Sequence, residues 1–361
     1  MISWHFPRAD LAKQYMDAFD TGITEALTLF APRRMGKTEF VLLDLAPEAE
    51  LRGYQVGYCS FWNLQDNPAK ALRIALEGIS KTGKWTEKWE NSAGEISTNI
   101  AGVGLKLKPR NNDSIEESDI LAIIEILKKM AKKRTKTLLL LDEVQHLANE
   151  KHASLVATLR TAFDEYRGKI KVVYTGSSRD GLQRMFRDRK APMFHAAQQV
   201  DFPHLDSNFV AFMLNAFEQA SKRKVSLPKS TRIFKEMSNN PALFHNLLKH
   251  MLIKGIWDIQ IGYKNFLSLM DIDADYQVII DSCKPIDRAV LLYLSKNDED
   301  GIYSDSSKLF VSEYVGADIS VKALQNAINR LREKQLIYSP TRGLWVLEDD
   351  GFKRWIVETL E

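Results

Sequence analysis

The sequence has very little cysteine and no long hydrophobic run. Its two cysteines, Cys59 and Cys283, lie far apart, and neither belongs to a CxxC or Cys/His cluster, which argues against a disulfide scaffold and a structural zinc site. Even the apolar run TLLLL before Asp142 is far too short to cross a bilayer. The first residues lack a basic segment followed by an apolar one, so we expect no signal peptide, no membrane association and a cytoplasmic location.

An excess of charge of one sign is also missing, because 50 Lys and Arg face 47 Asp and Glu and the net charge is only +3. This balance does not indicate a nucleic-acid-binding protein by itself. The positive charge is clustered, however, at residues 128–136, 187–190 and 222–224. Each cluster is either a solvated face or a contact for a polyanion, and the sequence leaves both readings open.

Apolar, strand-like runs alternate with helical patterns over the first half of the chain. The expected strands are 26–31, 55–62, 137–141, 170–177 and 196–202. Several of these runs are apolar on both faces, which is typical of a parallel sheet covered by helices on both sides. We therefore predict an α/β fold with its ligand beyond the carboxyl ends of the strands.

The chain is long enough for two or three domains. We expect an α/β domain over 1–203, a helical lid over 204–280 and a third unit over 284–361. The order of the third unit is helix, helix, longer helix and hairpin, which is typical of a winged helix. Residues 81–117 break the α/β pattern, and we interpret them as an inserted hairpin or loop.

The stretch APRRMGKT, residues 31–38, matches the phosphate-binding pattern GxxxxGK[ST] except that Ala31 replaces its first glycine. It follows an apolar strand and opens a helix, an arrangement that directs backbone N–H groups at a phosphate. Lys37 would reach the β- and γ-phosphates, and Thr38 would offer its hydroxyl to Mg²⁺. Gly36, where the backbone must approach phosphate most closely, is present, so we expect an intact site.

An adjacent pair of acids, Asp142 and Glu143, ends the apolar run 137–141. Two carboxylates at the end of a buried strand are costly unless a cation or a water molecule needs them. Asp142 would hold Mg²⁺, and Glu143 would polarise the water that attacks the γ-phosphate. The alternative is an acidic pair that only caps a helix after a core strand.

The segments APRRMGKTEF, LLLLDEVQHL, VVYTGSS and NNPALFHNLL resemble the phosphate loop, acidic strand, first sensor and lid helix of the AAA+ superfamily. They are most similar to its archaeal-type, STAND-like branch, and the resemblance covers nearly the whole chain except 81–117. It implies an Mg²⁺-dependent ATPase, with Thr38 and Asp142 at the metal and Ser177 or Ser178 as a sensor. The nucleotide contacts that it implies are Arg33, Arg34, Met35, Gly36, Lys37 and Thr38. We add Pro32 and Glu39, which flank them, as candidate contacts.

Two further expectations follow from this resemblance. Arg187 and Arg189 lie in a stretch that often carries an arginine finger, which would make self-association depend on nucleotide; alternatively, they are surface arginines. The chain departs from the family at the start of PALFHNLL, which lacks an arginine. A second-sensor arginine is therefore in doubt, and His245 is a weak substitute.

The last unit could bind double-stranded DNA or a protein. Its candidate DNA contacts, on the predicted recognition helix and wing, are Lys322, Asn326, Arg330, Arg332 and Arg342. Against DNA binding, residues 284–361 hold 11 Lys and Arg but 13 Asp and Glu, and winged helices also dock proteins. We expect an ATP-controlled switch or assembly factor acting on DNA or a partner effector, as in mobile-element or defence systems. The alternatives are a DNA-binding regulator with little turnover and a STAND-like signalling ATPase whose winged helix docks protein.

Overall fold

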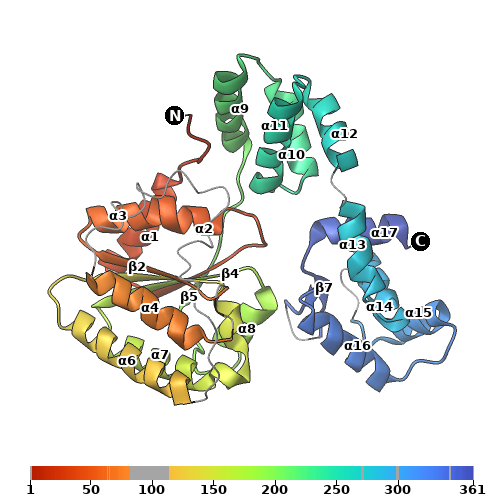
Figure 1. The fold of residues 1–361 in the computed structure, drawn as a ribbon. Coiled ribbons are helices and arrows are strands. Elements are labelled where there is room, and N and C mark those ends of the chain that lie inside the picture. Colours follow the sequence, from red (N-terminus) through yellow and green to blue (C-terminus); the bar gives the residue numbers. More distant parts are fainter. Residues whose placement is uncertain are drawn as a thin grey trace.

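The computed structural model of the protein shows three parts, arranged around separate hydrophobic cores (Figure 1). The structure describes residues 2–62, 64, 66–81, 114–269, 272–297, 301–340 and 343–360. The hairpin or loop expected over 81–117 lies outside these residues apart from its two ends, which belong to helices. In these ranges, no helix has the length and apolar character needed to span a membrane.

A parallel sheet of five strands forms the first part, in the order β2-β3-β4-β1-β5. Every neighbouring pair of these strands is parallel, so the predicted parallel sheet is confirmed. The strands are β1 (Ala26–Phe30), β2 (Gln55–Ser60), β3 (Thr137–Asp142), β4 (Ile170–Gly176) and β5 (Gln198–Asp201).

Helices cover both faces of this sheet (Figure 1). Side chains alternate along β3, so that Leu138 and Leu140 enter one core and Leu139 and Leu141 enter the other. The first core lies under α1 (Ala9–Asp20), α2 (Lys37–Phe40), η1 (Val41–Leu45) and α3 (Ala46–Leu51). The second lies under α4 (Pro68–Lys81), α6 (Ser114–Ala131), η3 (Val144–Ala148), α7 (Ala153–Glu165) and α8 (Arg179–Phe186).

Four helices form the second part around a core rich in phenylalanine: α9 (Ser207–Ser221), α10 (Leu227–Glu236), α11 (Pro241–Lys254) and α12 (Ile259–Leu269). Helix α11 begins where the sequence predicts, because Pro241 occupies its first turn and the Asn240 side chain accepts a hydrogen bond from the Leu243 N–H.

The third part follows in the order α13 (Ile272–Asp281), α14 (Pro285–Lys296), α15 (Asp305–Val315), α16 (Val321–Glu333), β6 (Ile337–Tyr338), β7 (Val346–Leu347) and α17 (Asp350–Thr359). Strands β6 and β7 pair antiparallel. The sequence patterns indicated α14, α15, α16 and the two strands, but they did not indicate α13 or α17. Phe352 and Trp355 of α17 are buried in the same core as α14 and α16.

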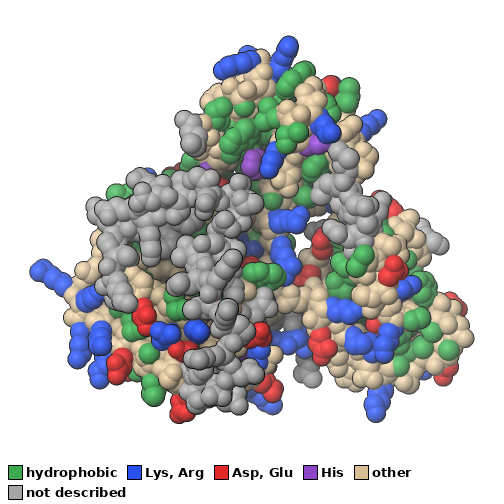
Figure 2. Space-filling model, viewed as in Figure 1, with side chains coloured by type: hydrophobic (Ala, Val, Ile, Leu, Met, Phe, Trp, Pro, Cys, Tyr) green, Lys and Arg blue, Asp and Glu red, His purple; other side chains and the backbone are tan. Residues whose placement is uncertain are grey.

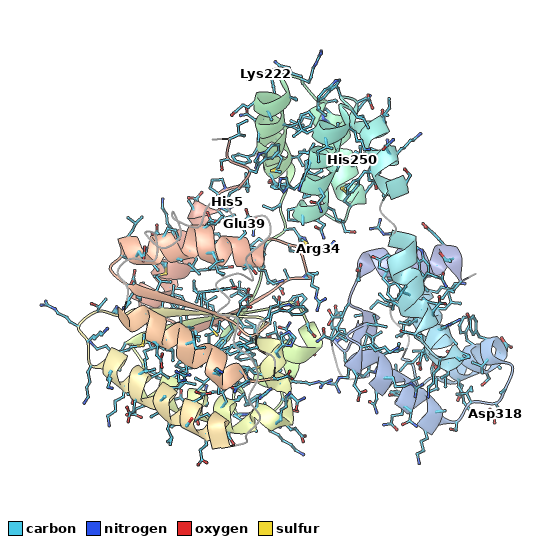
Figure 3. All side chains as sticks on the ribbon, viewed as in Figure 1. His5, Arg34, Glu39, Lys222, His250 and Asp318 are labelled. Carbon is cyan, nitrogen blue, oxygen red and sulfur yellow. The ribbon has the colours of Figure 1, made fainter. Side chains whose placement is uncertain are left out.

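The N-terminal segment before α1 joins the first part to the second. Phe6 packs edge-on against Phe209 and Phe212 of α9, and Trp4 lies against His245 of α11. Between these two aromatic contacts, His5 faces the helix that follows the loop at residues 31–36 (Figure 3). The segment therefore contacts the four-helix part and the loop helix at once.

Both ring nitrogens of His5 face carboxylate oxygens, Nδ1 at 3.0 Å from Glu39 Oε1 and Nε2 at 3.0 Å from Asp44 Oδ1. Both nitrogens can donate only in the protonated ring. Burial opposes the charged ring, but the hydrogen bonds to the two carboxylates outweigh it and raise the pKa of His5 to about 9. His5 is therefore a cation that ties the N-terminal segment to the loop helix at neutral pH.

We predict that His5→Asn lowers the free energy of unfolding in a pH-dependent way. A pKa raised by folding stabilises the protein fully below the unfolded value near 6.5, and this stabilisation is lost as pH rises through about 9. After allowance for partial exposure, the loss at pH 6 should be about 1–2 kcal/mol, shrinking toward zero at about pH 10. Urea unfolding at the two pH values measures it. His204→Asn, an exposed histidine, is the control, and an equal loss at both pH values would contradict the charged contact.

Candidate nucleotide-binding site

The loop between β1 and α2 turns through two residues with left-handed backbone, Arg34 (φ 66°) and Gly36 (φ 82°). No atom lies within 4 Å of where a Cβ on Gly36 would stand, so the turn faces open space. The Lys37 ammonium closes the loop from inside, donating to the carbonyl oxygens of Ala31 and, at 2.9 Å, Pro32. Such a turn, at the start of a helix, can present backbone N–H groups to an anion.

Lys37 is buried, with 5% of its surface exposed. Burial lowers the pKa of its ammonium to about 8, the carboxylates of Glu143 and Asp142 oppose this shift, and the cation of Arg33 adds to it. Its only hydrogen bonds within the described chain are to the two loop carbonyls. An anion in the loop would offer this buried cation a stronger partner than a neutral carbonyl.

Asp142 collects hydrogen bonds from three different elements at the carboxyl end of β3. Its carboxylate accepts from Thr38 Oγ1 at 2.8 Å, from the Tyr58 hydroxyl at 3.0 Å and from Thr175 Oγ1. Thr38 opens α2, while Tyr58 and Thr175 belong to the neighbouring strands β2 and β4. The hydroxyl and carboxylate predicted to bind Mg²⁺ therefore face each other. Both are oxygen donors, which suit Mg²⁺ when substrate phosphates and water complete its coordination.

Glu143 lies next to Asp142 with a left-handed backbone, at φ 56°. Its Oε2 accepts hydrogen bonds from Ser177 Oγ at 2.9 Å and from Gln145 Nε2. Ser178 points elsewhere, since its hydroxyl caps α8 by accepting from the Gly181 N–H. Of the two sensor candidates, Ser177 is thus the one in contact with Glu143.

The other predicted nucleotide contacts surround this centre with different exposures. Met35 is buried in the core, whereas Arg33 is exposed. Arg34 is exposed as well (Figure 3). Arg33 lies 5.3 Å from the ring centre of Trp62, which in turn packs edge-on against His146. Glu39 points away to His5. Pro32 offers its carbonyl to Lys37.

Arg187 and Arg189 lie on the surface after α8. The Arg187 Nε donates to Gln199 Oε1 on the edge strand β5 at 2.6 Å. The role of either arginine as a finger stays a prediction. His245, the weak substitute for a second sensor, packs against Trp4, and burial lowers its pKa.

The predicted DNA contacts of α16 divide into two groups. Lys322 and Asn326 are exposed on one face of the helix. Arg330 is engaged inside the third part, where its guanidinium pairs with Asp287, a carboxylate that is only 2% exposed. Arg332 lies 5.8 Å from the ring centre of Trp345. Arg342 lies outside the described residues. We therefore leave Arg330 out of any proposed DNA surface.

Three residues of the candidate site were missed by the sequence analysis: Tyr58, Thr175 and Gln145. Tyr58 and Thr175 reach Asp142 because β2 and β4 flank β3 in the sheet, and the order of strands is not written in the local sequence. Gln145 was visible in the DEVQ motif, but nothing in the motif says that its side chain turns back to Glu143.

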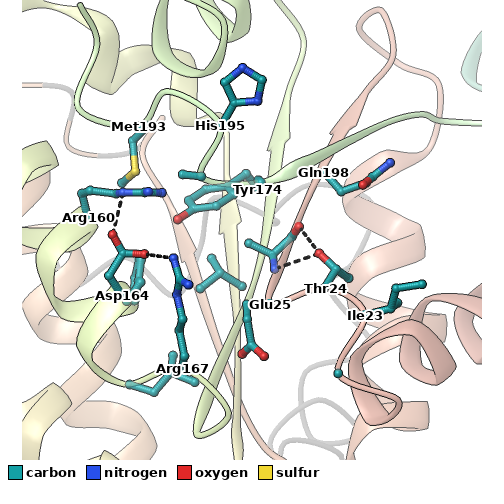
Figure 4. Close-up of a pocket in the computed structure, with 17 residues that line it drawn as sticks. Ile23, Thr24, Glu25, Arg160, Asp164, Arg167, Tyr174, Met193, His195 and Gln198 are labelled. Carbon is teal, nitrogen blue, oxygen red and sulfur yellow. Dashed lines mark hydrogen bonds and ion pairs between the residues drawn. The ribbon is translucent and has the colours of Figure 1, made fainter. Parts of the chain in front are cut away.

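A separate cavity of about 340 Å³ lies at the amino ends of β1 and β4, away from the loop (Figure 4). The charges that line it are paired: Asp164 binds Arg160 at 2.8 Å and Arg167 at 2.7 Å. Glu25 binds Lys171 at 2.8 Å. Because its charges are compensated and it lies away from the carboxyl ends of the strands, the loop edge remains the candidate site.

Comparison with known proteins supports the fold. No protein-family model and no curated protein matches the sequence. A Walker-type ATPase of Pyrococcus abyssi is 14% identical with a TM-score of 0.60, covering 99% of this chain and 96% of that one. The ADP form of the Aeropyrum pernix ORC2 protein is 12% identical with a TM-score of 0.58, covering 97% and 92%. The Aeropyrum pernix ORC1 protein in complex with DNA is 13% identical with a TM-score of 0.50, covering 99% and 92%. The chain therefore has the α/β fold of these proteins over nearly its whole length, as the sequence predicted.

Proposed function

We propose that the chain binds ATP with Mg²⁺ and hydrolyses the γ-phosphate. The observation that carries this proposal is the convergence of Lys37, Thr38, Asp142 and Glu143 at one edge of the sheet, linked by the Thr38–Asp142 hydrogen bond of 2.8 Å. A cationic side chain, two oxygen donors suited to Mg²⁺ and a second carboxylate are the groups that phosphoryl transfer to water requires.

Each group has a separate role in this proposal. The loop amides and Lys37 bind the phosphates, and Thr38 and Asp142 hold the metal ion. When bound, Mg²⁺ neutralises negative charge on the phosphate oxygens. Glu143 orients the attacking water and accepts its proton, while Ser177 contacts Glu143 from the end of β4.

We predict that Lys37→Ala weakens ATP binding about 10–100-fold, because the buried cation no longer meets the phosphates. Glu143→Gln should keep ATP binding and lower kcat about 10²–10⁴-fold, because an amide cannot accept the proton. Phosphate release and titration calorimetry measure the two effects separately. Lys132→Ala, an exposed lysine at the end of α6, is the matched control.

Turnover that survives Lys37→Ala unchanged would refute the site. ATP binding without turnover in the wild type would instead favour a regulator that uses nucleotide only as a ligand.

The Tyr58 hydroxyl gives a finer test of the metal position. We predict that Tyr58→Phe raises the Mg²⁺ concentration needed for half-maximal ATP binding about 5-fold, equivalent to about 1 kcal/mol, because Asp142 loses one of the donors that orient it. Calorimetric ATP titrations over a range of Mg²⁺ concentrations measure this shift. Tyr54→Phe is the control, because the Tyr54 hydroxyl binds Asp20 instead. Identical Mg²⁺ dependence in the two variants would contradict the assignment of Asp142 to the metal.

We further propose that the chain comprises an ATPase domain (1–203), a helical lid expected over 204–280 and a winged helix expected over 284–361, and that bound nucleotide sets the relative orientation of these domains. Because α13 packs in the core of the third part, we place the end of the lid before α13. Such a switch would act on DNA or on a partner protein. If Arg187 or Arg189 reaches the γ-phosphate of a neighbouring copy, self-association would depend on nucleotide.

The exposed face of α16 favours DNA as the partner of the third unit. Lys322 and Asn326 lie there one turn apart, where a cation can bind phosphate and an amide can contact base edges. On the face shown in Figure 2, however, basic and acidic side chains are interspersed over this part. Docking of a protein is therefore the alternative.

We predict that the chain binds duplex DNA with an affinity that falls as salt rises, and that Lys322→Ala reduces the slope of log K against log salt by about 1. Fluorescence anisotropy with a labelled duplex at several salt concentrations measures it. Lys308→Ala, on α15, is the comparison variant. Absence of salt-dependent binding in the wild type would exclude DNA and favour the protein-docking alternative.

A further inference from the structure

Gln145, a residue with no role in the proposed reaction so far, contacts the proposed base directly. Its amide nitrogen donates to Glu143 Oε2 and, at 3.2 Å, to Ser177 Oγ. Ser177 Oγ donates to the same Glu143 oxygen at 2.9 Å. The three side chains therefore form a closed triangle at the ends of β3 and β4.

The orientation of the Gln145 amide is fixed by chemistry. An ionised carboxylate only accepts hydrogen bonds, so the NH₂ group must face Glu143. This orientation leaves Gln145 Oε1 buried without a hydrogen-bond partner in the described chain. A buried unsatisfied carbonyl costs about 1–3 kcal/mol. The side chain is therefore held in place at the expense of stability.

Two glycines make room for this side chain. A Cβ on Gly176 would stand 2.7 Å from Gln145 Oε1, and a Cβ on Gly181 would stand 2.4 Å from Gln145 Cβ. Neither glycine has a left-handed backbone. A side chain at Gly181 would therefore collide with Gln145, and one at Gly176 would collide with Gln145 and with Leu182. Gln145, which is 6% exposed, fills the space beside both glycines.

The triangle also determines which oxygen of the Glu143 carboxylate is left without a hydrogen bond. Its Oε2 accepts two hydrogen bonds, which use both lone pairs of that oxygen. Oε1 has no such contact among the hydrogen bonds of the described chain and is left to receive a proton. The left-handed backbone of Glu143, at φ 56° and ψ 43°, costs about 1–2 kcal/mol and fixes the direction of the side chain.

We propose that Gln145 is a positioning residue that, with Ser177, holds one oxygen of Glu143 so that the other is directed at the attacking water. This inference rests on the proposed ATP hydrolysis. The Gln145 amide orients the Glu143 carboxylate through its hydrogen bond. A side chain of similar size that cannot donate a hydrogen bond does not replace it.

Two substitutions at Gln145 separate orientation from packing. Gln145→Leu fills the slot without a donor, and kcat should fall about 10–100-fold while the affinity for a non-hydrolysable ATP analogue stays within about 3-fold. When ionised, the carboxylate introduced by Gln145→Glu cannot donate a hydrogen bond to Glu143, so this variant should lower kcat similarly. The neighbouring charge of Glu143 favours protonation of the introduced group, and the protonated form can donate, so kcat relative to the wild type should rise as the pH is lowered.

A purely structural role would not produce this recovery. The matched controls are Gln219→Leu and Gln219→Glu, because Gln219 is an exposed glutamine on α9. Wild-type kcat in Gln145→Leu, or a ratio for Gln145→Glu that does not change with pH, would overturn the positioning role.

Turnover by the wild-type chain shows whether a failure concerns the proposed function or only the role of Gln145. Absence of Lys37-dependent turnover in the wild type would overturn the ATPase proposal and the positioning role of Gln145 with it. Normal turnover in Gln145→Leu would overturn the role of Gln145 alone. A double-mutant cycle of Gln145→Leu and Glu143→Ala, each of which removes one partner of the hydrogen bond, tests the contact in urea unfolding independently of activity. Non-additive effects are expected, and additive effects would refute the contact.

Discussion

The carboxylate of Asp142 is the point on which the candidate site depends. It lies at the end of β3 with 3% of its surface exposed, and it accepts hydrogen bonds from Thr38, Tyr58 and Thr175. These donors come from the loop helix and from the two strands that flank β3. A buried carboxylate without such donors would be costly. The contacts therefore stabilise Asp142 and also fix where the loop helix begins relative to the sheet.

The same helix connects the site to the rest of the molecule. Glu39, which follows Thr38 directly, binds His5 at 3.0 Å, and the neighbouring Phe6 packs into the core of the four-helix part. On the other side of that part, Arg354 of α17 donates to Ser238 Oγ at 2.5 Å and to the Glu236 carbonyl at 3.3 Å. Contacts thus run from the helix that follows the candidate loop through the four-helix part to the C-terminal part.

Much of the fold could be predicted from the sequence, because local patterns determine it. Apolar runs such as 137–141 and the Asn240–Pro241 helix start indicate their elements without any long-range information. Helices α1, α12, α13 and α17 were not indicated. In α17, the buried Phe352 and Trp355 are placed by contacts with Tyr276, a residue far away in the sequence.

The candidate site, like the fold, could be predicted where local sequence motifs define it and not where it depends on long-range contacts. The motif residues Lys37, Thr38, Asp142 and Glu143 carry recognisable spacing, whereas Tyr58 and Thr175 enter the site only through the order of the strands. Arg330 shows the opposite case: its position on α16 suggested a surface cation, but the Asp287 carboxylate that binds it lies on another helix.

The most direct test of the account is a crystal structure of the chain with Mg²⁺ and a non-hydrolysable ATP analogue. In that structure the phosphates should lie against the backbone of residues 31–38 with the Lys37 ammonium beside them, and the metal ion should lie between Thr38 and Asp142. A triphosphate bound at any other place, or a metal ion that contacts neither of these two side chains, would contradict it.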